Sequence, residues 1–154
     1  MAKAINLDTS QRVDITCRKG DTFDLSLTLK DNASTPASVV ADNDTFKMEV
    51  RTTDEGGDPY ADSEATIILS TEDTDNSDTK QIVLKDSAGT NMTSSSVGLA
   101  DTDGVVRFTV SSSNMASTSA GLYVYDIEMT DASESSKVTT LIYGTFKINE
   151  DVSV

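Results

Sequence analysis

The stretch from residue 121 to residue 129 constrains the fold most, because its apolar and polar side chains alternate at the two-residue period of a half-buried β-strand. One face collects large apolar side chains, namely Tyr123, Tyr125, Ile127 and Met129. The other face holds Val124 and otherwise polar side chains, namely Asp126, Glu128 and Thr130. Burial of the apolar face would stabilise a fold by roughly 6–10 kcal/mol before conformational entropy is subtracted. The stretch therefore predicts a strand with one face on a core and the other in water.

The same alternation recurs along the chain and predicts an all-β domain. Further strands are expected at 13–18, 22–30, 45–51, 65–70, 80–85, 104–110 and 137–148. Long polar loops are expected at 31–44, 52–64 and 86–103, and no stretch has a convincing helical pattern. A chain of 154 residues is long enough for one domain with its own core. We predict a single immunoglobulin-like antiparallel β-sandwich with long polar loops over 13–148, an N-terminal arm at 1–12 and a C-terminal tail at 149–154.

Two connections carry specific expectations. Gly20 and Asp21 predict a turn, so the strands on either side form a hairpin or a corner. The strand before this turn is expected to point Val13, Ile15 and Cys17 inward. The acidic segment between 65–70 and 80–85 is expected to form a solvated hairpin tip.

The start of the strand at 121 also matches a detail of immunoglobulin-like domains. Tyr123 stands two residues before a predicted core position, Tyr125, and follows a connection after the strand at 104–110. Immunoglobulin-like domains place a tyrosine corner at this point, two residues before the position where antibodies have a cysteine. Tyr123 is then the corner residue, and a plain aromatic strand face is the competing interpretation.

Composition disfavours several classes of protein. Twelve basic residues against twenty-six acidic residues give a net charge of −14, which repels phosphate backbones and anionic membrane surfaces. We therefore expect no nucleic-acid partner and no membrane partner. No apolar run is long enough to span a bilayer, and the N-terminus lacks the apolar core of a signal peptide. These features predict a protein made in a cytoplasm and kept there unless it leaves inside a larger particle.

Enzymatic and cofactor chemistry is also disfavoured. The chain has no histidine, and its single cysteine, Cys17, is interpreted as a small buried apolar residue rather than a nucleophile. No phosphate-binding glycine loop, nucleophile elbow or zinc-ligand spacing is present. We predict a protein that is not an enzyme and has no cofactor.

One cluster of hard oxygen ligands is a weak candidate for calcium. Its members are Asp73, Asp75, Asn76 and Asp78. The segment lacks the glycine and the glutamate that an EF-hand loop requires at its sixth and twelfth positions. A solvated acidic segment is the favoured interpretation, and no metal site is predicted.

The first residues form a candidate assembly arm. Ile5 and Leu7 alternate with polar neighbours, which suffices to add a strand to an exposed sheet edge but not to fold alone. A frayed terminus is the open alternative.

Three short motifs resemble the N-terminal immunoglobulin-like domain of baseplate upper proteins and related small structural proteins of tailed bacteriophages. They lie at 18–25, 120–127 and 143–148. The first joins a basic residue to Gly-Asp and an apolar strand, the second opens a strand with Gly-x-Tyr, and the third closes the fold with Gly-x-Phe. The residues that carry the resemblance are Gly20, Asp21, Phe23, Gly121, Tyr123, Tyr125, Gly144 and Phe146.

The resemblance implies a non-enzymatic virion structural protein. Such a protein would assemble on the tail, baseplate or neck, or decorate the capsid. Its partners would be further copies of itself and other virion proteins, so a homo-oligomer or many copies on a particle are expected. The glycines, aspartate and aromatics of the three motifs are residue types that shape turns and cores, and they form no catalytic constellation.

A carbohydrate-binding β-sandwich module is the alternative function. Sugar platforms normally need exposed aromatic rings, and the chain has no tryptophan. Most of its aromatic residues fall on predicted core positions, which leaves Tyr60 and Tyr143 as the plausible exposed rings.

Overall fold

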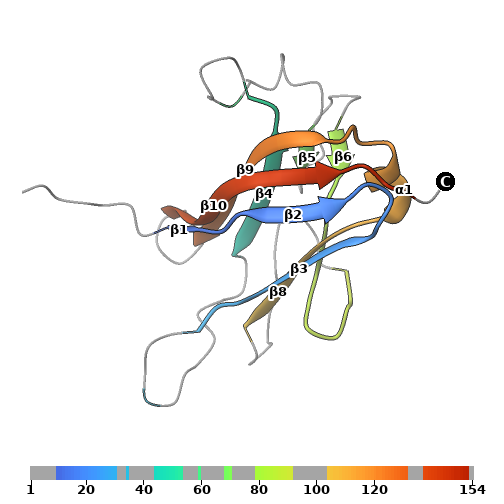
Figure 1. Cartoon of the computed structure of the whole chain (residues 1–154). Helices are drawn as coiled ribbons and strands as arrows, with labels where there is room; N and C mark the ends of the chain where they lie inside the picture. Colours follow the sequence, from blue (N-terminus) through green and yellow to red (C-terminus); the bar gives the residue numbers. More distant parts are fainter. Residues whose placement is uncertain are drawn as a thin grey trace, which may run out of the picture.

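A computed structural model shows two β-sheets packed face to face, so the predicted all-β sandwich is confirmed (Figure 1). The structure describes residues 10–30, 34, 44–53, 59, 68–70, 79–91, 104–131 and 137–152. The larger sheet has seven strands in the order β1-β10-β9-β4-β5-β6, with β2 also paired to β10. The smaller sheet has three strands in the order β3-β8-β7.

The strand boundaries are as follows. The larger sheet contains β1 (Gln11–Arg12), β2 (Ile15–Arg18), β4 (Thr45–Arg51), β5 (Ile68–Ser70), β6 (Thr79–Gln81), β9 (Gly121–Asp131) and β10 (Lys137–Asn149). The smaller sheet contains β3 (Phe23–Thr28), β7 (Val83–Lys85) and β8 (Val105–Val110).

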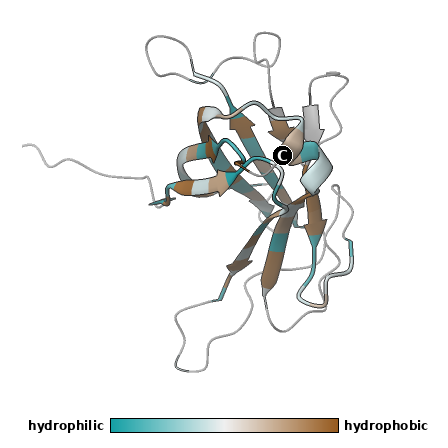
Figure 2. Ribbon diagram, turned by 45° about the vertical axis from the view of Figure 1, so that its right-hand side comes forward, coloured by the Kyte–Doolittle hydropathy of each residue, from teal (hydrophilic) through white to brown (hydrophobic). Residues whose placement is uncertain are grey.

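The core lies between the sheets and is built from the inward face of each strand. In β9 the side chains of Tyr123, Tyr125 and Ile127 are buried, as the alternation in this stretch predicts. Buried side chains from the facing strands complete the core, among them Phe46, Met48, Val50, Val106, Phe108, Phe146 and Ile148. Figure 2 shows hydrophobic segments on the strands of both sheets. The apolar contacts between the sheets therefore follow directly from the two-residue period.

The connection between β2 and β3 is a corner that carries the chain from one sheet to the other. The amide of Asp21 donates a hydrogen bond to the carbonyl of Arg18 at 3.2 Å. Gly20 has φ of +86°, in the left-handed region that glycine occupies without a steric penalty. The predicted turn is present, and of the two arrangements left open it forms the corner.

The prediction that no helix occurs is wrong at one place. A short helix, α1 (Ser112–Ala116), links β8 to β9, and the side chain of Ser111 caps it by accepting a hydrogen bond from the amide of Asn114. Met115 is buried, so the helix contributes one side chain to the core. Five residues span little more than one turn, which is too short to give a helical period in the sequence.

The sheets are not purely antiparallel. Both β1 and β2 pair with β10 in parallel, and β5 pairs with β6 in parallel. The parallel pairing of β5 with β6 contradicts the expected hairpin, and the segment predicted as one strand at 80–85 divides between the two sheets. Strand pairing depends on contacts across the fold that alternation alone does not encode.

Val13 does not face inward, which corrects the expectation for the first strand. Its side chain is 40% exposed, whereas Ile15 and Cys17 are partly buried and packed against the core. The carbonyl oxygen of Val13 takes the inward position and accepts a hydrogen bond from the hydroxyl of Tyr125 at 2.5 Å. Residues 11 and 12, expected to belong to the arm, form β1 at the edge of the larger sheet.

Candidate functional site

Three aromatic residues of the motifs pack together, and the other motif residues lie on or beside the strands that carry them. The ring of Phe146 contacts Phe23 edge-on at a centroid distance of 5.3 Å and Tyr125 at 6.0 Å. Gly121 begins β9, and Gly20 with Asp21 forms the corner before β3. These residues therefore join β2, β3, β9 and β10 from both sheets.

Tyr123 makes the contact that defines a tyrosine corner. Its hydroxyl donates a hydrogen bond of 2.6 Å to the carbonyl of Ser119, four residues upstream and just after α1. Burial raises the pKa of the Tyr123 phenol. The phenol therefore stays protonated and remains a donor at neutral pH.

Gly144 permits the closest approach between the N-terminal segment and β10. A Cβ atom at this position would lie 2.3 Å from the carbonyl oxygen of Val13 and 2.8 Å from a carboxylate oxygen of Asp14. Across this contact the amide of Val13 donates to the carbonyl of Tyr143 at 2.9 Å, and the amide of Thr145 donates to Asp14 at 3.0 Å. The absence of a side chain at Gly144 is what lets the backbone at Val13 reach the sheet.

The electrostatics of this contact follow from its hydrogen bonds. The amide of Thr145, together with Arg12, lowers the pKa of Asp14. Burial, with a smaller effect from the Asp14 charge, raises the pKa of Tyr125 to about 12. Both groups thus keep the protonation states that their hydrogen bonds require at neutral pH.

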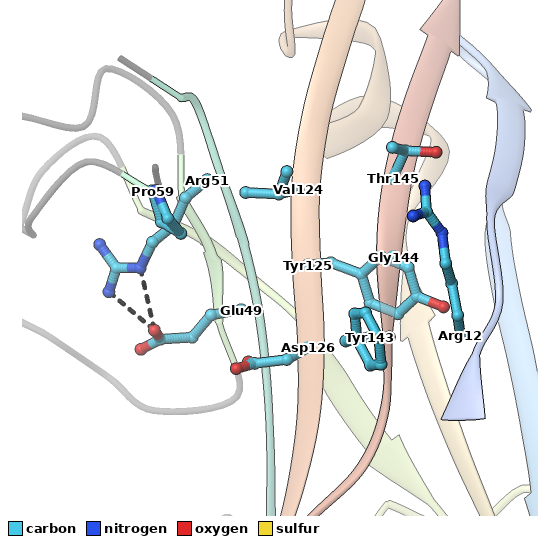
Figure 3. Close-up of a pocket in the computed structure, with 10 residues that line it drawn as sticks. All are labelled: Arg12, Glu49, Arg51, Pro59, Val124, Tyr125, Asp126, Tyr143, Gly144 and Thr145. Atoms are coloured by element: carbon cyan, nitrogen blue, oxygen red, sulfur yellow. Dashed lines mark hydrogen bonds and ion pairs between the residues drawn. The ribbon is translucent and has the colours of Figure 1, made fainter. Parts of the chain in front are cut away.

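A pocket of about 380 Å³ lies on the outer face of the larger sheet. We call it the outer-face pocket; its lining residues are Arg12, Glu49, Arg51, Pro59, Val124, Tyr125, Asp126, Tyr143, Gly144 and Thr145. Figure 3 shows Arg51 and Glu49 on one side, Asp126 and Tyr143 in the middle and Arg12 on the far side. The pocket is therefore assembled from β1, β4, β9 and β10, with Pro59 at its rim.

Charged groups of both signs face this pocket. Arg51 donates two hydrogen bonds to one carboxylate oxygen of Glu49, from Nε at 3.0 Å and from Nη2 at 2.7 Å. Lys47 forms an ion pair with the other oxygen of Glu49 at 3.0 Å. Asp126 lies directly opposite Glu49 in the register of β4 and β9. Burial raises the pKa of Asp126, as do the nearby charges of Glu128 and Glu49.

Of the remaining predicted site residues, Tyr143 and Cys17 lie in the described part of the chain and the others do not. Tyr143 is 39% exposed, in line with its expected outward position. Cys17 is half-buried, and burial together with the nearby Asp21 raises the pKa of its thiol to about 11. Several positions lie outside the described residues, namely Ile5, Leu7, Tyr60, Asp73, Asp75, Asn76 and Asp78.

Sequence reasoning did not single out the charged cluster of the outer-face pocket. In β4, Lys47, Glu49 and Arg51 alternate with buried residues, and this alternation in the sequence places all three on the outer face. Their proximity to Asp126 depends on the register between β4 and β9, which the sequence does not show. Across the described ranges no group of three or more histidine, cysteine or acidic side chains is placed to hold a metal ion. In the same part of the chain, no helix has the length and apolar character needed to cross a membrane.

Comparisons with known proteins identify no family. No family model matches the chain, and no curated protein matches it. A solved structure of a family 123 glycoside hydrolase from Clostridium perfringens is similar at a TM-score of 0.48 and 13% sequence identity. The similarity covers 97% of this chain and 24% of the hydrolase chain. A likeness this remote carries no argument about function.

Proposed function

We propose that this chain is a non-enzymatic structural subunit of a tailed-bacteriophage particle. The observation that carries the proposal is the role of the three motifs that resemble the baseplate upper-protein domain. Gly144, Tyr125 and Phe146 hold the N-terminal segment against the last strand, and Gly20 with Asp21 turns the chain between the sheets. Each motif residue shapes the fold, which is what a small building block requires.

The sheet edges supply a mode of attachment. The larger sheet has β1 at one edge, and this strand contains residues 11 and 12 of the predicted arm at 1–12. In the smaller sheet β3 is an outer strand, and no described strand pairs with its free side. An open edge accepts an extended segment by strand addition. We propose that the arm of one subunit, through Ile5 and Leu7, pairs with an open edge of a neighbouring subunit or another virion protein.

The proposal fits a subunit present in many copies on the tail, baseplate, neck or capsid. Closed symmetric assemblies are the usual outcome when identical surfaces associate. The net charge of −14 opposes nonspecific association of free subunits, so that assembly depends on the specific edge contact.

Mass spectrometry of purified particles of the encoding phage tests the role directly. Many copies of this chain per particle would support the proposal, and its absence from mature particles would overturn it. Light scattering of the purified protein then distinguishes a closed oligomer from a subunit that associates only on the particle.

Deletion of residues 1–8 tests the arm. The shortened protein is expected to keep its thermal unfolding midpoint, because the arm precedes β1, and to incorporate into particles less efficiently. Substitution of Ile5 and Leu7 by serine is the matched variant of full length. Undiminished incorporation of both variants would rule out attachment through the arm.

A further inference from the structure

The outer-face pocket has the size and lining of a small-ligand site. Its volume of about 380 Å³ lies within the range of known ligand pockets, roughly 300–1,000 Å³. Its walls come from strands of one rigid sheet, which fixes the side chains at their bases. The tyrosine corner does not use these outward-facing side chains.

Tyr143 gives the pocket an exposed aromatic surface. Residues 142, 144 and 146 of β10 are buried, so the alternation of the strand directs Tyr143 outward, where it is 39% exposed. Val124 and Pro59 add apolar surface to the same pocket. An exposed aromatic ring with an apolar surround is the surface on which the C–H face of a sugar ring stacks.

The polar groups of the pocket are oriented before any ligand arrives. Arg51 holds the carboxylate of Glu49 through two hydrogen bonds, which fixes both groups. The carboxylate of Asp126 is partly buried and lies opposite the like charge of Glu49, with the cations Lys47 and Arg51 nearby. Hydroxyl groups of a ligand can donate hydrogen bonds to this carboxylate.

The charge balance favours a neutral ligand. At and beside the pocket, three cations stand against three carboxylates, namely Arg12, Lys47 and Arg51 against Asp14, Glu49 and Asp126, so the site has no excess charge. The chain as a whole carries −14, which repels an anionic ligand. A ring that offers both hydroxyl donors and oxygen acceptors, with an apolar face, complements this lining.

We propose that the outer-face pocket binds one ring of a neutral saccharide. Tyr143 is the stacking platform, Asp126 and Glu49 accept hydrogen bonds from sugar hydroxyls, and Arg51 and Arg12 donate to sugar oxygens. The site does not depend on the structural role proposed above, since a particle subunit and a free module could both carry it.

Glycan-array screening of the full chain, followed by titration calorimetry with the best oligosaccharide, tests the site. Tyr143→Ala and Asp126→Asn are each expected to weaken binding by about tenfold or more. Tyr143→Phe keeps the ring and is expected to retain binding. Leu122→Ala removes a side chain that is 65% exposed on the same sheet outside the pocket, and it serves as the matched control.

Three outcomes would overturn the saccharide site. They are the lack of any bound neutral glycan at millimolar concentration, binding that survives both weakening variants, and binding of lysine-rich peptides in place of glycans. Circular dichroism of each variant confirms that it is folded. Parallel titrations with a free oligosaccharide and with purified bacterial surface polysaccharide show whether the pocket binds the saccharide as a free sugar or as part of a cell-surface polymer.

Discussion

Replacing Gly144 with alanine should damage the fold through a single backbone contact. The added Cβ would lie 2.3 Å from the carbonyl oxygen of Val13 and 2.9 Å from its carbonyl carbon. Both atoms belong to the backbone, so neither can rotate away as a flexible side chain would. The segment at Val13 must therefore move off β10.

The expected loss follows from the hydrogen bonds at this contact. The bond from the Val13 amide to Tyr143 contributes roughly 0.5–1.5 kcal/mol, and a buried Tyr125 hydroxyl without its acceptor costs about 1–3 kcal/mol. The reduced entropy of the unfolded alanine chain offsets about 0.4–1 kcal/mol. The midpoints of these ranges give an expected loss of about 2 kcal/mol in the free energy of unfolding for Gly144→Ala. For a chain of this size that corresponds to a fall of about 4–8 °C in the unfolding midpoint.

Urea and thermal denaturation of the variant measure this loss. Gly20→Ala is the matched control, because its added Cβ first meets a carboxylate oxygen of Asp151 at 3.5 Å and there is no backbone clash. Its expected loss is about 1 kcal/mol, from the left-handed backbone alone. Equal losses for the two variants, or an unchanged midpoint for Gly144→Ala, would refute the steric reasoning. Hydrogen exchange should also show faster exchange at the Val13 amide in Gly144→Ala only.

Three further measurements probe other parts of the molecule. Tyr123→Phe should lower the free energy of unfolding by about 1 kcal/mol, since it removes the hydrogen bond to Ser119; an unchanged denaturation midpoint would contradict this. The pKa of Asp126 is raised in the folded state, so the fold favours the protonated carboxyl over the carboxylate. The free energy of unfolding therefore falls as the pH rises through that pKa and the group ionises. Asp126→Asn should therefore stabilise the protein at pH 7 by about 0.2–1 kcal/mol, and the difference should vanish below about pH 4; a constant difference across this range would be inconsistent. The Cys17 thiol, with a pKa of about 11, should react with a disulfide reagent at pH 8 far more slowly in the folded than in the unfolded protein, because about a hundredfold less thiolate is present; equal rates would show that the thiol is accessible and unperturbed.

Much of the fold was predictable because β-strands have a period that sequence preserves. The inward faces of β4 and β9 follow from alternation alone, and so does the outward position of Tyr143. The tyrosine corner could be located from the spacing of two aromatic residues. The short helix α1 gave no such signal, since its formation depends on the cap at Ser111 and on burial of Met115.

The remaining features depend on which strands become neighbours. The parallel pairing of β2 with β10 and the exposure of Val13 follow from the close approach at Gly144, which joins residues far apart in the chain. The pocket likewise requires Glu49 and Asp126 to lie in register on adjacent strands. Alternation places each residue on the outer face, but only the sheet order brings them together.

The parallel pairing of β2 with β10 determines how the domain would respond to tension. The two strands run side by side in the same direction from opposite ends of the chain, with Ile15 beside Phe146 and Arg18 beside Asn149 (Figure 1). A force that pulls the two termini apart therefore acts along both strands in opposite senses. It loads their hydrogen bonds together in shear, instead of opening them one at a time as in unzipping. A domain closed in this way resists extension along its length.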